Sequence, residues 1–169
     1  MARLKQFYDK HIGLPIDPDA AEPGIVGRPI HIHPGLMIIV FIGGSLGTLA
    51  RYSVTFVLPD GANGWPFATL TVNLIGTFFL GILLQGLFNH GPDQGRRQLL
   101  RLGLGTGFLG AFTTYSTFAV ETNMLLDHGQ TSIALIYILV SLMGGILLST
   151  FGIFVATKHH RKRHVGRNM

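Results

Sequence analysis

The chain has 169 residues, of which 47% are hydrophobic and only 12% are charged. Soluble domains carry about 25% charged residues, so this composition and the mean hydropathy of +0.42 argue against a water-soluble protein. Cysteine is absent, which excludes a disulfide framework, a thiolate zinc site and a cysteine nucleophile. The formal charge of +5 is carried mainly at the ends of apolar runs, which fits membrane orientation better than nucleic-acid binding.

Charged residues are missing from four long stretches of the chain. Asp, Glu, Lys and Arg do not occur in residues 34–50, 61–92, 102–120 and 128–157. A helix needs about 20 mostly apolar residues to cross a bilayer, and the first stretch reaches that length when it is extended past Arg51. We therefore predict an all-α polytopic membrane protein. Its four transmembrane helices are predicted to cover residues 34–58, 66–89, 97–126 and 131–157.

The segments outside the predicted helices are polar. Residues 1–33 contain acidic residues and several prolines and glycines but no apolar run, so we predict a polar extension there. Residues 34–157 are predicted to form the membrane domain and residues 158–169 a basic tail.

Basic residues are distributed unevenly about this predicted topology. Nine of them lie close to the predicted helix ends on the side of the two termini: Arg28, Arg96, Arg97, Arg101, Lys158, Arg161, Lys162, Arg163 and Arg167. The two loops on the other side contain no Lys or Arg. Because loops rich in Lys and Arg stay in the cytoplasm, both termini are predicted to be cytoplasmic in a multi-pass protein of the cell membrane. The stretch KHHRKRH (158–164) is interpreted as an anchor at the lipid headgroups, with binding of anionic lipid or RNA as the alternative.

The first predicted helix carries three residues at four-residue steps. Gly43, Gly47 and Arg51 share one face. The two glycines indicate close contact with another helix. Arg51 has two interpretations that the sequence leaves open, an anchor at the membrane interface or an attractor for anions in a vestibule.

The second predicted helix has a polar face. Thr69, Asn73 and Thr77 are four residues apart and line the same side. An asparagine well inside a span is costly to leave facing lipid, so it has to face protein or a watery cavity. Two explanations stay open, a hydrogen bond between helices and a polar pathway.

The third predicted helix has the least regular sequence. Residues 103–118 read GLGTGFLGAFTTYSTF, with four glycines followed by four hydroxyl residues. Glycine and closely spaced hydroxyls both disfavour a continuous helix, so we predict a break near residues 110–113. Broken backbone survives at membrane depth only when it is buried in protein or lines a cavity, and its released carbonyls can hold a cation. A kinked but continuous helix is the alternative.

The fourth predicted helix repeats the pattern of a polar face. Tyr137, Ser141, Gly145 and Ser149 are four residues apart and so lie on one side. A tyrosine in such a place is commonly a packing residue, but three helices each carrying hydroxyls on one face favour a shared polar pathway.

Three motifs together resemble the fluoride-channel family called Fluc or CrcB. They are GGSLGTLARY (43–52), ATLTVNLIGTFFLG (68–81) and GFLGAFTTYSTFAVE (107–121). The resemblance covers about residues 36–157. It implies a passive channel that exports fluoride from the cytoplasm. It also implies four helices per subunit, an antiparallel dimer with two fluoride pathways, and a structural sodium ion at the centre of the dimer.

The resemblance also implies roles for individual residues. The pore asparagine corresponds to Asn73 and the threonine one turn before it to Thr69. The two pore-lining aromatic positions correspond to Phe118 and to Tyr115, where the family's motif has phenylalanine. The structural sodium ion is expected on the backbone carbonyls of Gly110 and Thr113.

Further positions complete the pathway that the resemblance implies. The hydroxyl residues along the pore correspond to Thr114, Ser116, Tyr137 and Ser141. A glutamate at the end of this pathway corresponds to Glu121, and the vestibule arginine to Arg51. Gly145 stands where the family's next serine is expected, which weakens that end of the pathway.

The chemistry of these residues fits a fluoride-selective channel. Fluoride is small and strongly hydrated, so a pore has to replace the hydrogen bonds of water, and amide and hydroxyl groups can donate them. The edge of an aromatic ring carries the positive part of its quadrupole and can face an anion. The sequence contains no recognisable catalytic motif, so an enzyme is not expected. Two alternatives remain, a small proton-coupled exporter that uses Glu121 and a non-transporting membrane scaffold.

The predicted partners are fluoride, the bilayer and a second subunit, with no nucleic acid. The subunit is expected to be either a second copy of this chain or an oppositely oriented homologue. An antiparallel homodimer requires one chain to insert in both orientations, whereas the basic residues favour one orientation. The charge distribution therefore favours the heterodimer.

Overall fold

The structure is a computed structural model that describes residues 34–61 and 64–165, with the backbone alone for residues 161–165. The predicted polar extension, residues 1–33, lies outside the described residues. The chain divides into two units, Met1–Met37 and Ile38–Met169, and the interactions described below belong to the second. The described elements are all helical, as predicted: α2 (Pro34–Val57), α3 (Phe67–Asn89), α4 (Arg96–Leu100), η2 (Arg101–Leu109), α5 (Gly110–Phe112), α6 (Tyr115–Asp127) and α7 (Thr131–Val165).

The helix boundaries agree with the predicted ones to within a residue, with one exception. Helices α2 and α3 match the first two predicted helices, and α4 to α6 together cover the third. The end of the fourth helix was predicted wrongly, since α7 continues from residue 157 to Val165 and includes most of the predicted basic tail. Hydropathy marks where the apolar part ends, but no Gly or Pro interrupts residues 158–165, and Lys and Arg are good helix formers.

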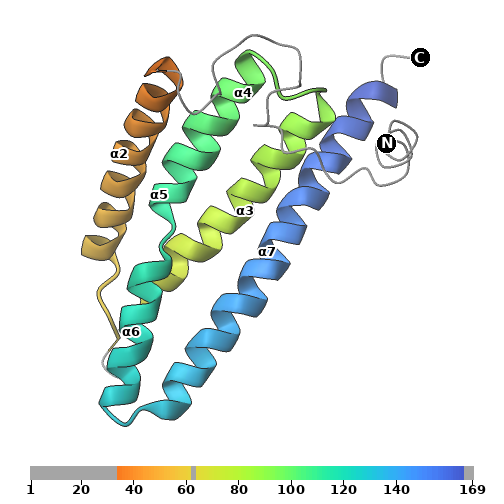
Figure 1. Ribbon diagram of the computed structural model, residues 1–169. Helices are drawn as coiled ribbons and strands as arrows, with labels where there is room; N and C mark the ends of the chain where they lie inside the picture. Colours follow the sequence, from red (N-terminus) through yellow and green to blue (C-terminus); the bar gives the residue numbers. More distant parts are fainter. Residues whose placement is uncertain (1–33, 62–63, 166–169) are drawn as a thin grey trace, which may run out of the picture. The chain divides into compact units, whose positions relative to one another are not determined.

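Helices α3 and α7 lie side by side and form the most extensive contact of the second unit (Figure 1). Glycines allow their backbones to approach closely. A Cβ atom on Gly81 would lie 2.5 Å from the carbonyl oxygen of Ser149, and one on Gly152 would collide with the carbonyl oxygen of Phe78. Larger residues at either glycine would therefore separate the two helices.

Helix α2 packs against η2 through the two glycines that the sequence singled out. A Cβ atom on Gly43 would collide with the carbonyl oxygen of Gly103, and one on Gly47 with that of Phe108. Both glycines are buried. The predicted close helix contact is thus confirmed, and its partner is the glycine-rich segment of the third predicted helix.

The glycine-rich segment is wound as a π-helix. Element η2 extends over nine residues, Arg101–Leu109, and includes three glycines. π-Helical windings are rare and usually limited to a single turn. The glycines therefore widen the helix without ending it, and the interruption comes a few residues later.

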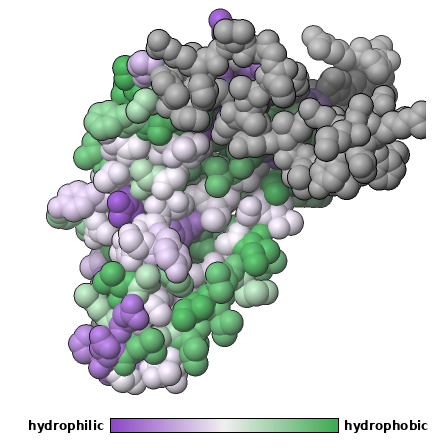
Figure 2. Space-filling view, in the orientation of Figure 1, coloured by the Kyte–Doolittle hydropathy of each residue, from purple (hydrophilic) through white to green (hydrophobic). Residues whose placement is uncertain are grey.

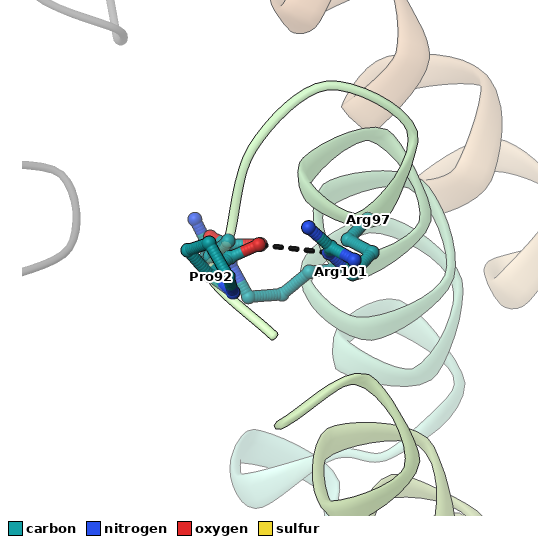
Figure 3. A network of polar contacts seen from close by, with 4 residues as sticks. Pro92, Arg97 and Arg101 are labelled. Atoms are coloured by element: carbon teal, nitrogen blue, oxygen red, sulfur yellow. Dashed lines mark hydrogen bonds and ion pairs between the residues drawn. The ribbon is translucent and has the colours of Figure 1, made fainter. Parts of the chain in front are cut away.

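The loop between α3 and α4 is held by two arginines (Figure 3). Arg97 donates from Nε to the carbonyl oxygen of Pro92 at 2.8 Å and from Nη1 to that of His90 at 2.7 Å. Arg101 forms an ion pair with Asp93, with 2.6 Å between Nε and Oδ2. These basic residues, which the sequence marks as topology determinants, thus also fix the conformation of their loop.

Large apolar side chains lie mostly on the outside of the described residues. Phe41 is 75% exposed, Phe88 80% and Leu147 65%. Figure 2 shows apolar residues over the visible side of α7, while polar residues gather at the end where α6 terminates. Three helices are long and apolar enough to cross a membrane: Pro34–Val57, Phe67–Asn89 and Thr131–His160. Such an arrangement is stable in a bilayer, where the exposed side chains contact lipid.

Candidate functional site

The third predicted helix is interrupted at two residues, Thr113 and Thr114. Thr113 has φ −78° and ψ 158°, and Thr114 has φ −147° and ψ 127°, so both are extended. The Thr114 hydroxyl accepts a hydrogen bond from the backbone N–H of Thr117 at 3.1 Å and caps α6. The predicted break is confirmed, and it falls on the hydroxyl residues after the glycines.

Asn73 of α3 pairs with the backbone at this break. Its Nδ2 donates to the carbonyl oxygen of Thr114 at 3.0 Å, and the Thr114 N–H donates to its Oδ1 at 2.8 Å. Backbone groups at a helix break have to be satisfied inside an apolar environment. Asn73 therefore supplies what the interrupted helix lacks, which explains an asparagine deep inside a span. An Asn amide carries two N–H groups, so one remains for another acceptor.

The break releases the two carbonyls that the family resemblance assigns to sodium. In a continuous helix the N–H of Thr114 would bond the carbonyl of Gly110, and that of Thr117 the carbonyl of Thr113. Here the first N–H donates to Asn73 and the second to the Thr114 hydroxyl. Gly110 is also exposed on the surface of the subunit. Uncharged carbonyls freed in this way are suitable ligands for a monovalent cation.

Arg51 contacts the same segment from α2. Its Nε donates to the carbonyl oxygen of Ala111 at 3.2 Å, a carbonyl that would bond the N–H of Tyr115 in a continuous helix. Neither interpretation of Arg51 from the sequence included this contact. The arginine is therefore a further group that stabilises the end of α5.

Glu121 of α6 lies between α3 and α7. Thr69 Oγ1 donates to its Oε1 at 2.6 Å and Tyr137 OH donates to its Oε2 at 2.8 Å. The side chains of Thr69 and Tyr137 are 3% and 0% exposed. The sequence reasoning assigned all three residues to one pathway but missed that the carboxylate accepts a hydrogen bond from each of the two hydroxyls.

The aromatic residues extend from this triad to the surface. The ring of Phe118 lies 5.1 Å from that of Tyr137 and 6.3 Å from that of Tyr115, measured between centroids. Tyr115 is 82% exposed, whereas Phe118 packs against the small core of Leu125 and Tyr137. The structure therefore brings the two predicted pore aromatics together, one inside and one at the surface of the subunit.

The remaining hydroxyl residues form two groups. The hydroxyl of Thr114 lies 3.3 Å from that of Ser116 and donates to that of Thr117 at 3.0 Å. Ser141 lies on α7, and its Oγ is buried without a hydrogen-bond partner among the described residues. A buried polar atom of this kind commonly has a ligand or water as its partner. The hydrogen-bonded pairs of this site could not be found from local sequence. Asn73 and Thr114 are 41 residues apart, and Thr69 and Glu121 are 52 residues apart.

Three long apolar helices and a helix interrupted beside polar side chains define a multi-pass helical membrane protein. A family model described as CrcB-like protein, Camphor Resistance (CrcB), matches residues 38–153. The match covers well over half of the chain, and the chain therefore belongs to the CrcB family, as its three motifs predict.

Curated relatives agree with this family. The chain is 45% identical over 116 residues to the fluoride-specific ion channel FluC 1 of Cutibacterium acnes, covering 69% of this chain and 81% of the relative. It is 46% identical over 119 residues to FluC 2 of Bacillus subtilis strain 168, covering 70% and 86%. FluC 2 of Listeria innocua is 44% identical over 119 residues, covering 69% and 88%.

Proposed function

We propose that this protein is a passive, fluoride-selective ion channel that exports fluoride from the cytoplasm, and that it is not an enzyme. The relatives at 44–46% identity are named fluoride-specific ion channels. The observation that carries the proposal is the interrupted third helix, whose break is surrounded by amide, hydroxyl and aromatic groups. These are the groups that can replace the hydration of a small anion.

The proposed topology has four membrane passes. Three are the long apolar helices α2, α3 and α7, and the fourth is the interrupted segment from α4 to α6, which has the length for a pass although no single helix in it has. Successive segments run in alternating directions in the second unit (Figure 1), which supports this topology. The uneven distribution of basic residues supports cytoplasmic termini in the cell membrane.

The proposed fluoride pathway uses the donors that remain available. Asn73 retains a second N–H, and the buried Ser141 hydroxyl has no partner among the described residues. Ser116 adds a hydroxyl beside the break, and the Thr114 hydroxyl becomes available when it rotates away from Thr117. Phe118 and Tyr115 add two aromatic rings, 6.3 Å apart between centroids, whose positive edges can face an anion. With no arginine or lysine among these groups, fluoride is held weakly enough to leave.

Glu121 has a defined place in this pathway. Thr69 and Tyr137 donate hydrogen bonds to its carboxylate, so they bind an anion only when their hydroxyls rotate away from Glu121. We propose that this triad is the end of the pathway and that Arg51 is the vestibule residue. The anion then competes with a carboxylate for the same two hydroxyl donors.

The channel is proposed to be an antiparallel dimer with a structural sodium ion. The released carbonyls of Gly110 and Thr113 supply two ligands per subunit, and a two-fold axis through the exposed Gly110 brings four together. An apolar groove of about 510 Å³ beside this segment, lined by Ile75, Phe79, Leu104, Phe108 and Phe112 among others, supports the packing of a second subunit there. The partner is a second copy or an oppositely oriented homologue.

A small proton-coupled exporter is the second candidate, favoured by one observation. The only carboxylate among these groups, Glu121, is half-buried between three helices, as a proton carrier would have to be. A non-transporting scaffold has no such supporting observation.

Fluoride efflux from liposomes that contain only this protein tests the proposal. A channel releases fluoride when a potassium ionophore compensates the charge, and it stays inactive without the ionophore. A symporter that moves fluoride and a proton together is electroneutral, so it releases fluoride without the ionophore and alkalises the lumen. An antiporter that exchanges fluoride for a proton moves net charge, so it needs the ionophore and acidifies the lumen. A pH change coupled to fluoride release therefore distinguishes an exporter from a channel. Absence of efflux under both conditions would contradict both transport functions and favour a scaffold.

A further inference from the structure

A small pocket lies between the ends of α3 and α7, away from the helix break. Its volume is about 220 Å³. Its apolar part consists of side chains of Ile82, Val155 and Ala156, and its polar part of Asn89, His90, His159 and His160. These two helices run in the same direction and reach this end of the second unit together (Figure 1).

The pocket lies where the apolar parts of both helices stop. The segment of α3 that is apolar enough to cross a membrane ends at Asn89, and that of α7 ends at His160. In a bilayer, the lipid headgroups lie at the level where these apolar segments end. The apolar wall therefore faces the acyl and glycerol region, and the polar wall faces the phosphates.

The imidazoles provide donors for an anion. His90 Nδ1 lies 2.6 Å from the carbonyl oxygen of Gly86 and donates a hydrogen bond to it, so Nε2 of the neutral ring is an acceptor and the donors to an anion come from the other imidazoles. The rings of His90 and His160 are in edge contact, with 5.5 Å between centroids, and His159 is exposed. Among the described residues no group of three or more His, Cys, Asp or Glu side chains is arranged to hold a metal ion. Imidazole N–H groups and the basic residues beside them are the kind of donors and charges that suit an anion.

Asn89 has an unused donor in the wall of the same pocket. Its Oδ1 accepts from Nε2 of Gln85 at 2.8 Å, while its Nδ2 is buried without a hydrogen-bond partner among the described residues. A buried donor without an acceptor is unfavourable. A ligand oxygen bound at this wall would supply the acceptor once the amide turns toward it.

The sequence around the pocket is strongly basic. Lys158 precedes the two α7 histidines, and Arg161, Lys162 and Arg163 follow them on the same continuous helix. None of the residues that line the pocket is acidic. Clusters of Lys and Arg next to a membrane span attract anionic lipids, with about 1 kcal/mol per residue as the usual scale.

We propose that this pocket binds the phosphate group of an anionic phospholipid from the adjacent leaflet. The imidazole N–H of His159 and the amide of Asn89 bind the phosphate oxygens, His160 completes the polar wall, and the apolar wall contacts the glycerol and upper acyl chains. This site is separate from the proposed fluoride pathway, and it does not depend on which ion the protein transports.

The test is a lipid titration of the full chain in detergent, read by native mass spectrometry. The probes are phosphatidylglycerol, phosphatidylcholine and inorganic phosphate. The first variant is a double one that combines His159→Ala and His160→Ala. The second is His159→Ala alone, in case the double variant does not fold. His128→Ala is the matched control, because His128 is exposed like His159 but follows the end of α6, away from the pocket.

We expect the wild type and His128→Ala to bind phosphatidylglycerol equally and to prefer it to phosphatidylcholine. The double variant is expected to weaken phosphatidylglycerol binding by about fivefold or more, and His159→Ala alone by a smaller factor. Unchanged affinity in both histidine variants would overturn the proposal. Equal binding of phosphatidylcholine would also overturn it, as would competition by millimolar inorganic phosphate, which would identify free phosphate as the ligand.

Discussion

The side chain of Asn73 forms two hydrogen bonds with the backbone of Thr114, one to its carbonyl oxygen at 3.0 Å and one from its N–H at 2.8 Å. The amide oxygen thus replaces the Gly110 carbonyl that the Thr114 N–H would bond in a continuous helix, and the amide N–H adds a donor to the Thr114 carbonyl. The break in the third helix and the polar residue in the second helix are therefore one structural feature.

Asn73→Asp is expected to reduce fluoride efflux strongly while dimers persist. Aspartate retains an acceptor for the Thr114 N–H but loses the amide donors, and it adds a negative charge beside a carbonyl and an anion. A hydrogen bond to an ion contributes about 1.5–3 kcal/mol, so efflux should fall at least about tenfold. An electrode records the efflux and gel filtration the dimer. Thr150→Val is the control, because its exposed hydroxyl bonds its own helix, and wild-type efflux in Asn73→Asp would exclude Asn73 from the pathway.

Phe118→Ile is expected to reduce fluoride efflux by about tenfold, because an aliphatic side chain has no positive edge and loses the contact with Tyr137. The measurement is the initial efflux rate per reconstituted protein. Phe41→Ile is the matched control, since Phe41 is 75% exposed on α2. Equal rates in the two variants would remove the ring of Phe118 from the pathway.

Tyr115→Phe is expected to conduct at close to the wild-type rate. The change keeps the ring and its contact with Phe118 and removes only a hydroxyl on a side chain that is 82% exposed in the subunit. The same efflux assay measures it. If the rate collapses, the hydroxyl itself takes part in conduction.

Glu121→Gln is expected to destabilise the folded protein by about 1–3 kcal/mol, because an amide offers one acceptor oxygen to two buried donors. Thermal unfolding in detergent measures this effect. Tyr137→Phe removes one of the same hydrogen bonds, so the two changes together should cost less than the sum of the single changes. Additive effects would mean that Glu121 and Tyr137 are not hydrogen-bonded in the protein that is measured.

Efflux through the same Glu121→Gln variant separates the two transport candidates. A channel still requires the potassium ionophore and shows no coupled proton movement. Proton movement that accompanies fluoride in the wild type and disappears in Glu121→Gln would instead establish the exporter.

Single cysteines are expected to reveal one membrane orientation when the chain is expressed alone. Gly91 and Gly129 are natural loop positions, but their φ angles of 114° and 72° strain any other residue. The exposed residues Gln94 and His128 in the same loops avoid that strain. We expect Gln94→Cys to be labelled only from inside and His128→Cys only from outside, since basic residues lie on one side. The chain would then need an inverted homologue as its partner, whereas labelling of each site from both sides would support a homodimer.

Hydropathy and residue spacing predicted most of the helical boundaries, because the length of an apolar run and the polarity of its ends are properties of the local sequence. The same reasoning located the break in the third helix, since glycines and hydroxyls disfavour helix wherever they cluster. It misplaced the end of α7, because the residues after 157 change the hydropathy without changing the helix propensity.

The sequence by itself determined the class of protein, the family and the helix faces that carry polar residues. Only the tertiary structure decided which of them form pairs: Asn73 with the Thr114 backbone, Arg51 with the Ala111 carbonyl, and Glu121 with two hydroxyls. Helical periodicity assigns a residue to a face, but a hydrogen bond depends on the register between helices. That register is set by close backbone contacts such as those at Gly43 and Gly81, which join segments far apart in the chain.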